Sequence, residues 1–203
     1  MIRIPQAVLN KLQTQKMQAL LFLACQSQGG STHSLVECAK AIATRYPSFK
    51  LLLVDFRLDN RDLSDMATTT GIPWQRKHEK HTSMIQNVDC LKDEPALSVL
   101  TSTGSSSLDL AALDSIITQL LSECSGKYDL ILLDFPPVLS SHIGAHLYKK
   151  ADGAILVVEA GATRKPIVKE SCARIEELEG KLLGIILNKR KKLIPQCIYR
   201  RFF

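Results

Sequence analysis

The chain has few aromatic residues, no long apolar run and no closely spaced pair of cysteines. Its 203 residues are only 5% aromatic but 45% hydrophobic, which is enough apolar material to bury a full core. No apolar run approaches the ~20 residues that span a bilayer, and the first residues lack the apolar stretch and cleavage site of a secretory signal. The composition excludes a disordered tail, a repeat array and a disulfide mini-protein. It predicts a soluble, cytoplasmic protein with one domain over residues 1–203.

The cysteines are too far apart in sequence for a zinc or redox site of the C-x-x-C type. We therefore expect free thiols at all six positions, which are Cys25, Cys38, Cys90, Cys124, Cys172 and Cys197. Three of them, Cys38, Cys124 and Cys172, lie within helical patterns, where a free cysteine usually acts as a small buried hydrophobe.

Positive charge is concentrated at the end of the chain. Six of the 26 basic residues follow Asn188 without any acid, and the number that remains equals the 20 acidic residues. This basic segment, residues 189–203, suits an anionic membrane surface or an acidic partner, and a solvated terminus accounts for it equally well. An amphipathic helix over 194–203 would place the protein peripherally at the inner membrane. No stacking platform accompanies the charge, so nucleic acid is not expected as a partner.

Short apolar runs alternate with longer amphipathic stretches along the chain. Alternation of this kind predicts an α/β fold with a doubly wound, mostly parallel sheet and helices on both faces. The predicted strands are Ala19–Ala24, Leu51–Asp55, Leu97–Thr101, Leu130–Asp134, Ala154–Glu159 and Leu182–Asn188. The predicted helices are Thr32–Arg45, Leu108–Glu123, Ser141–Lys150 and Lys165–Glu179.

Residues 70–94 interrupt this rhythm with glycine, proline and many polar side chains. We expect a long surface excursion, in which Trp74 either anchors a partner or, as we favour, pins the excursion to the body. Its two histidines, His78 and His81, are weak evidence for a metal site because no third ligand accompanies them.

Ligands of open parallel sheets bind beyond the carboxyl ends of the strands, so the residues that follow each strand are the candidate site. The first strand is followed by a loop that contains Gly29, Gly30, Ser31, Thr32 and His33. The second is followed by Asp55-Phe56-Arg57-Leu58-Asp59, and a later one by Asp134-Phe135-Pro136-Pro137.

In this order the three loops resemble those of the MinD/ParA-related P-loop ATPases, and most closely the bacterial tyrosine kinase (BY-kinase) domains of the CpsD/CapB type. The resemblance runs from the first predicted strand to the end of the chain and includes Tyr128, Asp129, Asp134, Pro136 and Pro137. It implies a P-loop NTPase (MinD-like) architecture, a role in capsule or exopolysaccharide synthesis, and a nucleotide site. In that site Thr32, Asp55 and Asp134 would hold Mg²⁺ and the two aspartates would be the catalytic residues.

Two departures weaken this site. The residue that aligns with the phosphate-binding lysine is Ser31, which carries no charge, and the first glycine of the loop is Gln28. Neither His33 nor Lys40 is a good replacement, because histidine is mostly neutral at pH 7 and Lys40 lies about two turns along the helix. A cradle without an ammonium group should bind a triphosphate poorly.

The second departure is Arg57, where the family has an aspartate. It either pairs with Asp55 or Asp134 in place of the metal, or contacts phosphate in place of the missing lysine. If Arg57 does not pair with Asp134, loop amides are the other expected partners of this carboxylate.

At the end of the last strand, Asn188 either reads the adenine base or caps the turn that begins the basic segment, and we favour the cap. The tyrosine-rich tail of the family's autokinases is reduced to Tyr199, and the ring-forming pattern would fall on Gln6, Leu9 and Leu12. Trans-phosphorylation of a tyrosine cluster and ring assembly are therefore not expected.

Three functions follow as hypotheses. The favoured one is a degenerate kinase, or pseudo-ATPase, that needs no cofactor and acts by binding a Wzz-like membrane co-polymerase or an active kinase relative. The second is an active ATPase or tyrosine kinase that binds ATP or ADP with Mg²⁺ through an atypical P-loop. The third is a MinD/ParA-like positioning ATPase that uses the basic segment to bind a membrane.

Overall fold

The computed structural model describes residues 18–27, 29–56, 74–77, 88–91, 97–101, 110–124, 126–140 and 145–189. The strands are β1 (Ala19–Ala24), β2 (Leu51–Asp55), β3 (Trp74–Lys77), β4 (Val88–Leu91), β5 (Leu97–Thr101), β6 (Leu130–Asp134), β7 (Gly153–Glu159) and β8 (Leu182–Asn188). The helices are α2 (Ser31–Arg45), α4 (Leu110–Cys124), α5 (Ala145–Lys150) and α6 (Lys165–Glu177).

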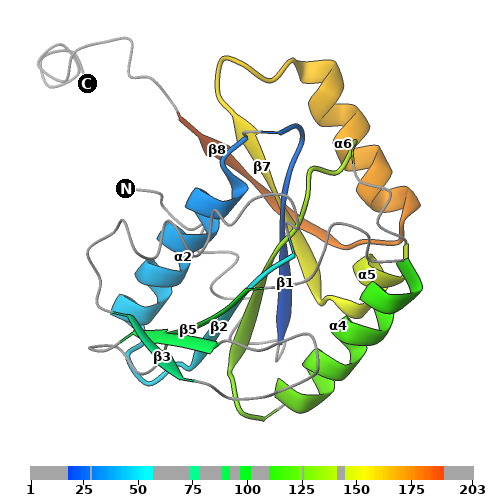
Figure 1. Cartoon of the computed structure of the whole chain (residues 1–203). Coiled ribbons are helices and arrows are strands. Elements are labelled where there is room, and N and C mark those ends of the chain that lie inside the picture. The colour runs from blue at the N-terminus through cyan, green and yellow to red at the C-terminus, as the bar shows by residue number, and fades with distance from the viewer. Residues whose placement is uncertain are drawn as a thin grey trace, which may run out of the picture.

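These strands form one sheet in the order β3-β4-β5-β2-β6-β1-β7-β8 (Figure 1). All pairings from β5 to β8 along this order are parallel. From β1 the chain moves outward to β2 and β5 on one side, and it later builds β7 and β8 on the other. The doubly wound, mostly parallel sheet that the sequence predicts is therefore confirmed.

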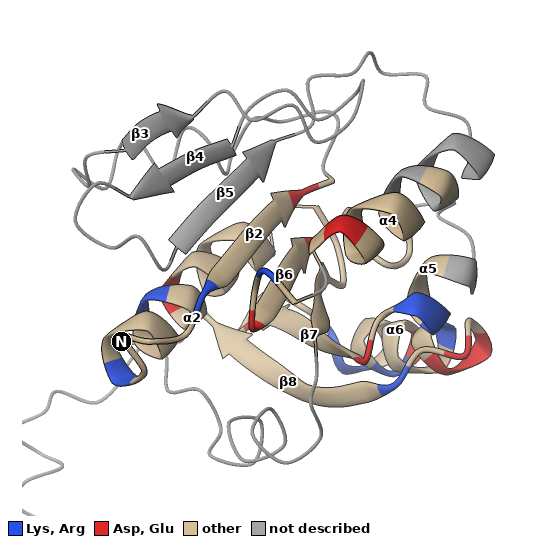
Figure 2. Cartoon of the chain, turned by 90° about the horizontal axis from the view of Figure 1, so that it is seen from below, with Lys and Arg blue, Asp and Glu red and all other residues tan. Residues whose placement is uncertain are grey.

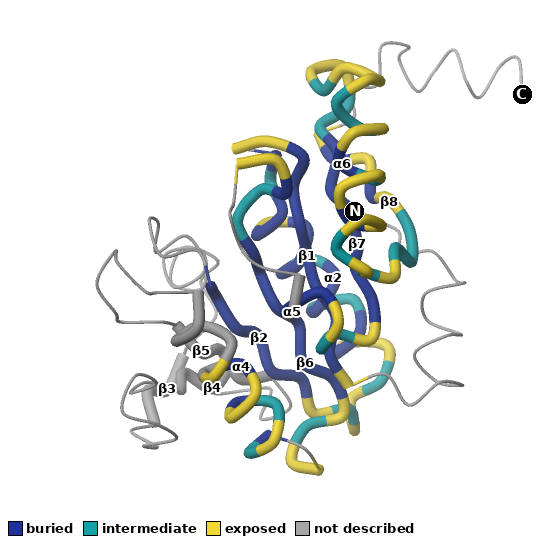
Figure 3. Tube along the Cα trace, turned by 90° about the vertical axis from the view of Figure 1, so that its right-hand side faces the viewer, coloured by how far each residue is buried: buried dark blue, intermediate teal, exposed yellow. Residues whose placement is uncertain are grey.

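Helices cover both faces of the sheet, and the sheet divides the core into two apolar layers (Figures 1 and 3). On one face, α2 packs through Leu35, Ala39 and Ile42 against apolar residues of β1, β2, β6 and β7. On the other, Ile117 of α4 and Ile175 of α6 belong to the second apolar cluster, together with residues of α5. Among the described residues, no helix combines the length and the apolar character needed to cross a membrane.

The predicted strands agree with the structure, except that β7 begins one residue earlier, at Gly153. The helices differ at their ends. Helix α2 includes Ser31, α4 runs to Cys124, and α6 ends at Glu177 because Glu179 adopts a positive φ of 58°. Helix α5 is described from Ala145, so the predicted start at Ser141 lies outside the described residues.

The predicted surface excursion over residues 70–94 is wrong in part, because β3 and β4 lie within it. They pair antiparallel with each other, and β4 pairs antiparallel with β5, so they extend one edge of the sheet. Each strand has only four residues and several are polar, so the alternation of apolar residues that reveals a strand is too short to recognise. Trp74 is the first residue of β3 and pairs with Leu91.

The two histidines that we judged weak evidence for a metal site, His78 and His81, lie outside the described residues. Within the described ranges, no group of three or more His, Cys, Asp or Glu residues is arranged to hold a metal ion.

Four of the six cysteines are described, and all four are free thiols, as predicted. Cys25, Cys38 and Cys124 are buried and Cys172 is half-buried. Burial raises the pKa of Cys38 to about 12, which is the behaviour of a small apolar side chain rather than of a reactive thiol.

Candidate functional site

Polar side chains end four of the parallel strands, and the alternation of the strands places them on one face of the sheet. Residues two and four positions before Asp55, Asp134 and Glu159 pack in the layer beneath α2, as does Ile186, two positions before Asn188. Because strand side chains alternate, the four end residues point to the α2 side as well. Asp55 lies opposite Asp134 in the register of β2 and β6, whose acidic ends appear in red in Figure 2.

The turn from β1 into α2 brings a helix N-terminus to this edge. Gly30 is the N-cap of α2, with φ 79° and ψ 34°, a left-handed conformation that favours glycine. Its carbonyl accepts the first helical hydrogen bond from Ser34 N at 3.0 Å. No side chain caps this end and no acidic residue lies in the first turn. The N–H groups and positive dipole of α2 therefore suit an anion.

Thr32 connects the first turn of α2 to the end of β6. Its hydroxyl donates a hydrogen bond to Asp134 Oδ2, and both side chains are buried. Asp55 is buried beside them, at 4% exposure. The three predicted magnesium ligands thus lie together, and oxygen donors of this kind are the ones that Mg²⁺ prefers. Asp134 thus has the Thr32 hydroxyl as one partner, and its expected pairing with Arg57 stays a prediction because Arg57 lies outside the described residues.

Two of the residues considered as replacements for a lysine at position 31, His33 and Lys40, are among the described residues. Ser31 lies in the first turn of α2, is 2% exposed and carries no charge. His33 is exposed, and Lys40 pairs with Glu37 along the helix at 3.5 Å, away from the loop. Arg57 and Gln28 lie outside the described residues. Neither His33 nor Lys40 therefore brings a positive charge to position 31.

Asn188 ties the end of β8 to the glycine loop. Its Nδ2 lies 3.3 Å from the carbonyl oxygen of Gly29 and 3.4 Å from that of Gly30, and donates to both. Its Oδ1 accepts a hydrogen bond from Lys189 N at 2.8 Å. The turn that Asn188 was expected to cap continues beyond Lys189 into residues that lie outside the described part of the chain, so the cap stays a prediction. The contact with the loop was not predicted, because the sequence places Asn188 at a strand end without showing which turn lies beside it.

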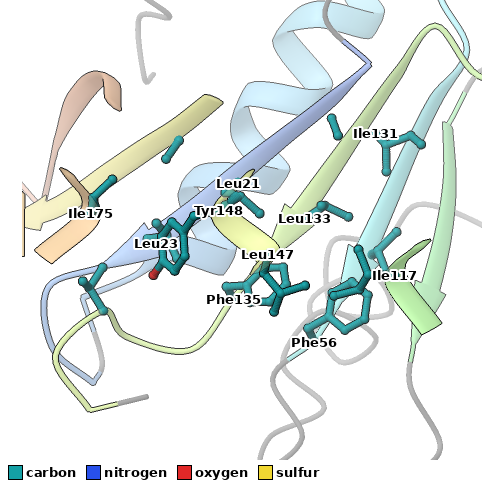
Figure 4. Packing of buried hydrophobic residues seen from close by; sticks show 14 of the residues in the cluster. Leu21, Leu23, Phe56, Ile117, Ile131, Leu133, Phe135, Leu147, Tyr148 and Ile175 are labelled. Atoms are coloured by element: carbon teal, nitrogen blue, oxygen red, sulfur yellow. The ribbon is translucent and has the colours of Figure 1, made fainter. Parts of the chain in front are cut away.

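The sequence reasoning also missed two phenylalanines beneath the site. Phe56 and Phe135 each follow one of the aspartates. Their rings stack, with centroids 4.9 Å apart, on the face of the sheet opposite to α2 (Figure 4). Phe56 N donates to the carbonyl of Asp134, and Phe135 N donates to that of Phe22. They hold the backbones that carry Asp55 and Asp134. The repeated Asp-Phe pair at two strand ends was the available signal.

The fold is that of the MinD/ParA-related P-loop NTPases. Its features are a buried parallel strand, a glycine turn, a helix N-terminus and a contact of Thr32 with Asp134 on the neighbouring strand. The MinD cell division protein of Aquifex aeolicus superposes with a TM-score of 0.63 at 18% identity, over 91% of this chain and 72% of that one. The kinase domain of VpsO gives a TM-score of 0.70 at 24% identity, over 92% and 95%.

The sequence relatives are bacterial tyrosine kinases, which confirms the resemblance drawn from the motifs. The chain is 28% identical over 181 residues to the tyrosine-protein kinase YwqD of Bacillus subtilis, covering 87% of this chain and 74% of the relative. It is 26% identical over 162 residues to the tyrosine-protein kinase CpsD of Streptococcus agalactiae serotype III, covering 79% and 70%. No family model matches the chain.

Proposed function

We propose that this chain is a degenerate bacterial tyrosine kinase that regulates exopolysaccharide or capsule synthesis by binding, rather than by phosphoryl transfer. The relatives named above support the kinase ancestry. The main support for a loss of catalysis is Ser31. Its hydroxyl lies in the first turn of α2, at the position where a lysine would neutralise the phosphates. Phosphoryl transfer depends on positioned charge, so the absence of this ammonium group removes a main source of rate.

The retained groups serve architecture in this proposal. Asp134 accepts the Thr32 hydroxyl, and this buried hydrogen bond joins α2 to the centre of the sheet. The expected partner is a Wzz-like membrane co-polymerase or an active kinase relative. A folded P-loop domain that does not hydrolyse ATP would keep one conformation, so the surface that it offers to such a partner would not change.

The test is turnover by the purified full chain. ATP hydrolysis and tyrosine phosphorylation are measured with Mg²⁺, for the natural sequence and for Asp134→Ala. We expect no turnover above the level of Asp134→Ala. Hydrolysis by the natural sequence that disappears in Asp134→Ala would contradict the proposal, because it would show a working site at these residues. Co-purification with the cytoplasmic part of a co-polymerase, retained in Asp134→Asn, tests the binding role.

One observation favours a second function, an active ATPase with an atypical loop. The side chains of Thr32, Asp55 and Asp134 lie together and suit Mg²⁺. This function needs a cation from elsewhere, and Arg57 is the candidate within the chain. Hydrolysis that falls at least tenfold in both Arg57→Ala and Asp134→Ala would establish it. Hydrolysis that is unchanged in both would exclude it.

A further inference from the structure

A lysine from the far end of the chain lies against the glycine loop. Lys189 follows Asn188 at the end of β8 and adopts a positive φ of 53°, which turns the chain at this point. Its backbone N–H is held by Asn188 Oδ1 at 2.8 Å. Its Cε lies 3.9 Å from the point where a side chain on Gly30 would begin. The side chain of Lys189 therefore runs past the N-cap of α2.

The ammonium group of Lys189 pairs with a carboxylate on the neighbouring strand. Lys189 Nζ lies 3.1 Å from Oε2 of Glu159, the last residue of β7, which is opposite Asn188 in the register. The lysine side chain is 49% exposed and that of Glu159 is 28% exposed. Exposed ion pairs contribute little to stability, so a stronger anion can take the place of this carboxylate at low cost.

The loop is short of the charge that Lys189 carries. The first turn of α2 presents backbone N–H groups without a capping side chain, and position 31 provides a hydroxyl. Two buried carboxylates, Asp55 and Asp134, lie at the neighbouring strand ends and repel an anion that approaches without a counter-charge. The Lys189 side chain passes the N-cap from the β8 side, so its ammonium group, if turned from Glu159 to the loop, would offset that repulsion.

We propose that Lys189 replaces the missing lysine from the end of β8, and that the loop thereby binds the diphosphate group of a nucleotide. On binding, the ammonium group exchanges Glu159 for a phosphate oxygen, while the N–H groups of α2 hold the remaining oxygens. The inference deepens the proposed function and rests on it in one respect, since the site binds its ligand without turning it over. Helix α2 and the end of β8, which lie far apart in sequence, form the site together.

The test is calorimetric titration of the full chain with ADP and with inorganic pyrophosphate, in low salt with a chelator present. The variants are Lys189→Ala, Lys189→Arg and Glu159→Gln. The matched control is Lys181→Ala, which removes an exposed lysine just before the opposite end of β8. We expect Lys189→Ala to weaken ADP binding about tenfold, the loss for one charge-assisted hydrogen bond, and Lys189→Arg to retain most of the affinity. Lys181→Ala should bind as the natural sequence does.

The decisive variant is Glu159→Gln. It removes the competing carboxylate, so it should tighten ADP binding severalfold, a gain that a merely structural ion pair would not produce. Tighter binding of ADP than of pyrophosphate identifies the ligand as a nucleotide, and equal binding overturns that part of the inference. Absence of ADP binding by the natural sequence, or equal affinities in Lys189→Ala and Lys181→Ala, overturns the role of Lys189. Each of these failures leaves the proposed binding function intact, whereas ATP turnover would overturn that function whatever Lys189 does.

Discussion

Replacement of Gly30 by alanine tests whether Asn188 fixes the glycine loop. Gly30 has φ 79°, in the left-handed region, so any side chain there is strained. An added Cβ would also lie 2.3 Å from Asn188 Nδ2. Real Cβ atoms do not approach a nitrogen this closely, so the asparagine side chain must move away. Its hydrogen bonds to the carbonyls of Gly29 and Gly30 would then be lost.

The two effects have separate magnitudes. The left-handed conformation costs roughly 1–2 kcal/mol for a residue with a Cβ. Displacing the buried amide of Asn188 costs about 1–3 kcal/mol, because its hydrogen bonds are broken and their partners stay buried. We therefore expect Gly30→Ala to lower the free energy of unfolding by about 3 kcal/mol. For a domain of this size this corresponds to a fall in Tm of roughly 6–12 °C.

A matched control separates strain from contact. Gly161 also has φ 79°, but nothing lies within 4 Å of a Cβ added there, so Gly161→Ala should show only the conformational cost. The assay is urea unfolding of Gly30→Ala, Asn188→Ala, the double variant and Gly161→Ala. Removing the amide relieves the clash, so the double variant should lose about 1–2 kcal/mol less than the sum of the single losses. Additive losses, or equal losses in Gly30→Ala and Gly161→Ala, would refute the contact.

Three further predictions concern the core. Cys38, whose pKa burial raises to about 12, should resist iodoacetamide at pH 8 until the protein is unfolded, as mass spectrometry of the alkylated peptides would show; labelling of the folded protein would contradict this. Burial also raises the pKa of Tyr148 to about 12, while Arg174 lowers it. The unfolded chain therefore loses this proton first, and stability should fall between about pH 10 and 12, with a shallower fall in Tyr148→Phe by urea unfolding. Phe135→Ala should cost about 3–5 kcal/mol of unfolding free energy, because it removes a buried ring that stacks on Phe56; a loss below about 1 kcal/mol would count against the role of this stack.

The parallel core could be predicted because its strands are buried on both faces. Strands such as Leu51–Asp55 and Leu130–Asp134 are continuous apolar runs that end in a polar residue, and such runs are readable one segment at a time. The loop at Gly30, the serine at position 31 and the polar strand ends are local features as well. For this reason the fold class followed from order and spacing, whereas the roles of Thr32, Asp55 and Asp134 were predicted from the resemblance of their loops to those of the P-loop ATPases.

Other features depend on which segments become neighbours in space. The pairing of β3 with β4 arises from hydrogen bonds between backbones. Four-residue segments with polar side chains give no sequence pattern from which this pairing could be predicted. The stack of Phe56 on Phe135 joins residues that belong to different strands.

The placement of Asn188 and Lys189 against Gly30 depends on the strand order that sets β8 beside β7 and β7 beside β1. Residue type and local periodicity are properties of the sequence itself. They therefore determine which segments become strands and which residues at the strand ends carry a charge. Contacts across 158 positions, such as that of Asn188 with Gly30, are decided by the packing of the whole sheet, because many separate burial energies together select one strand order.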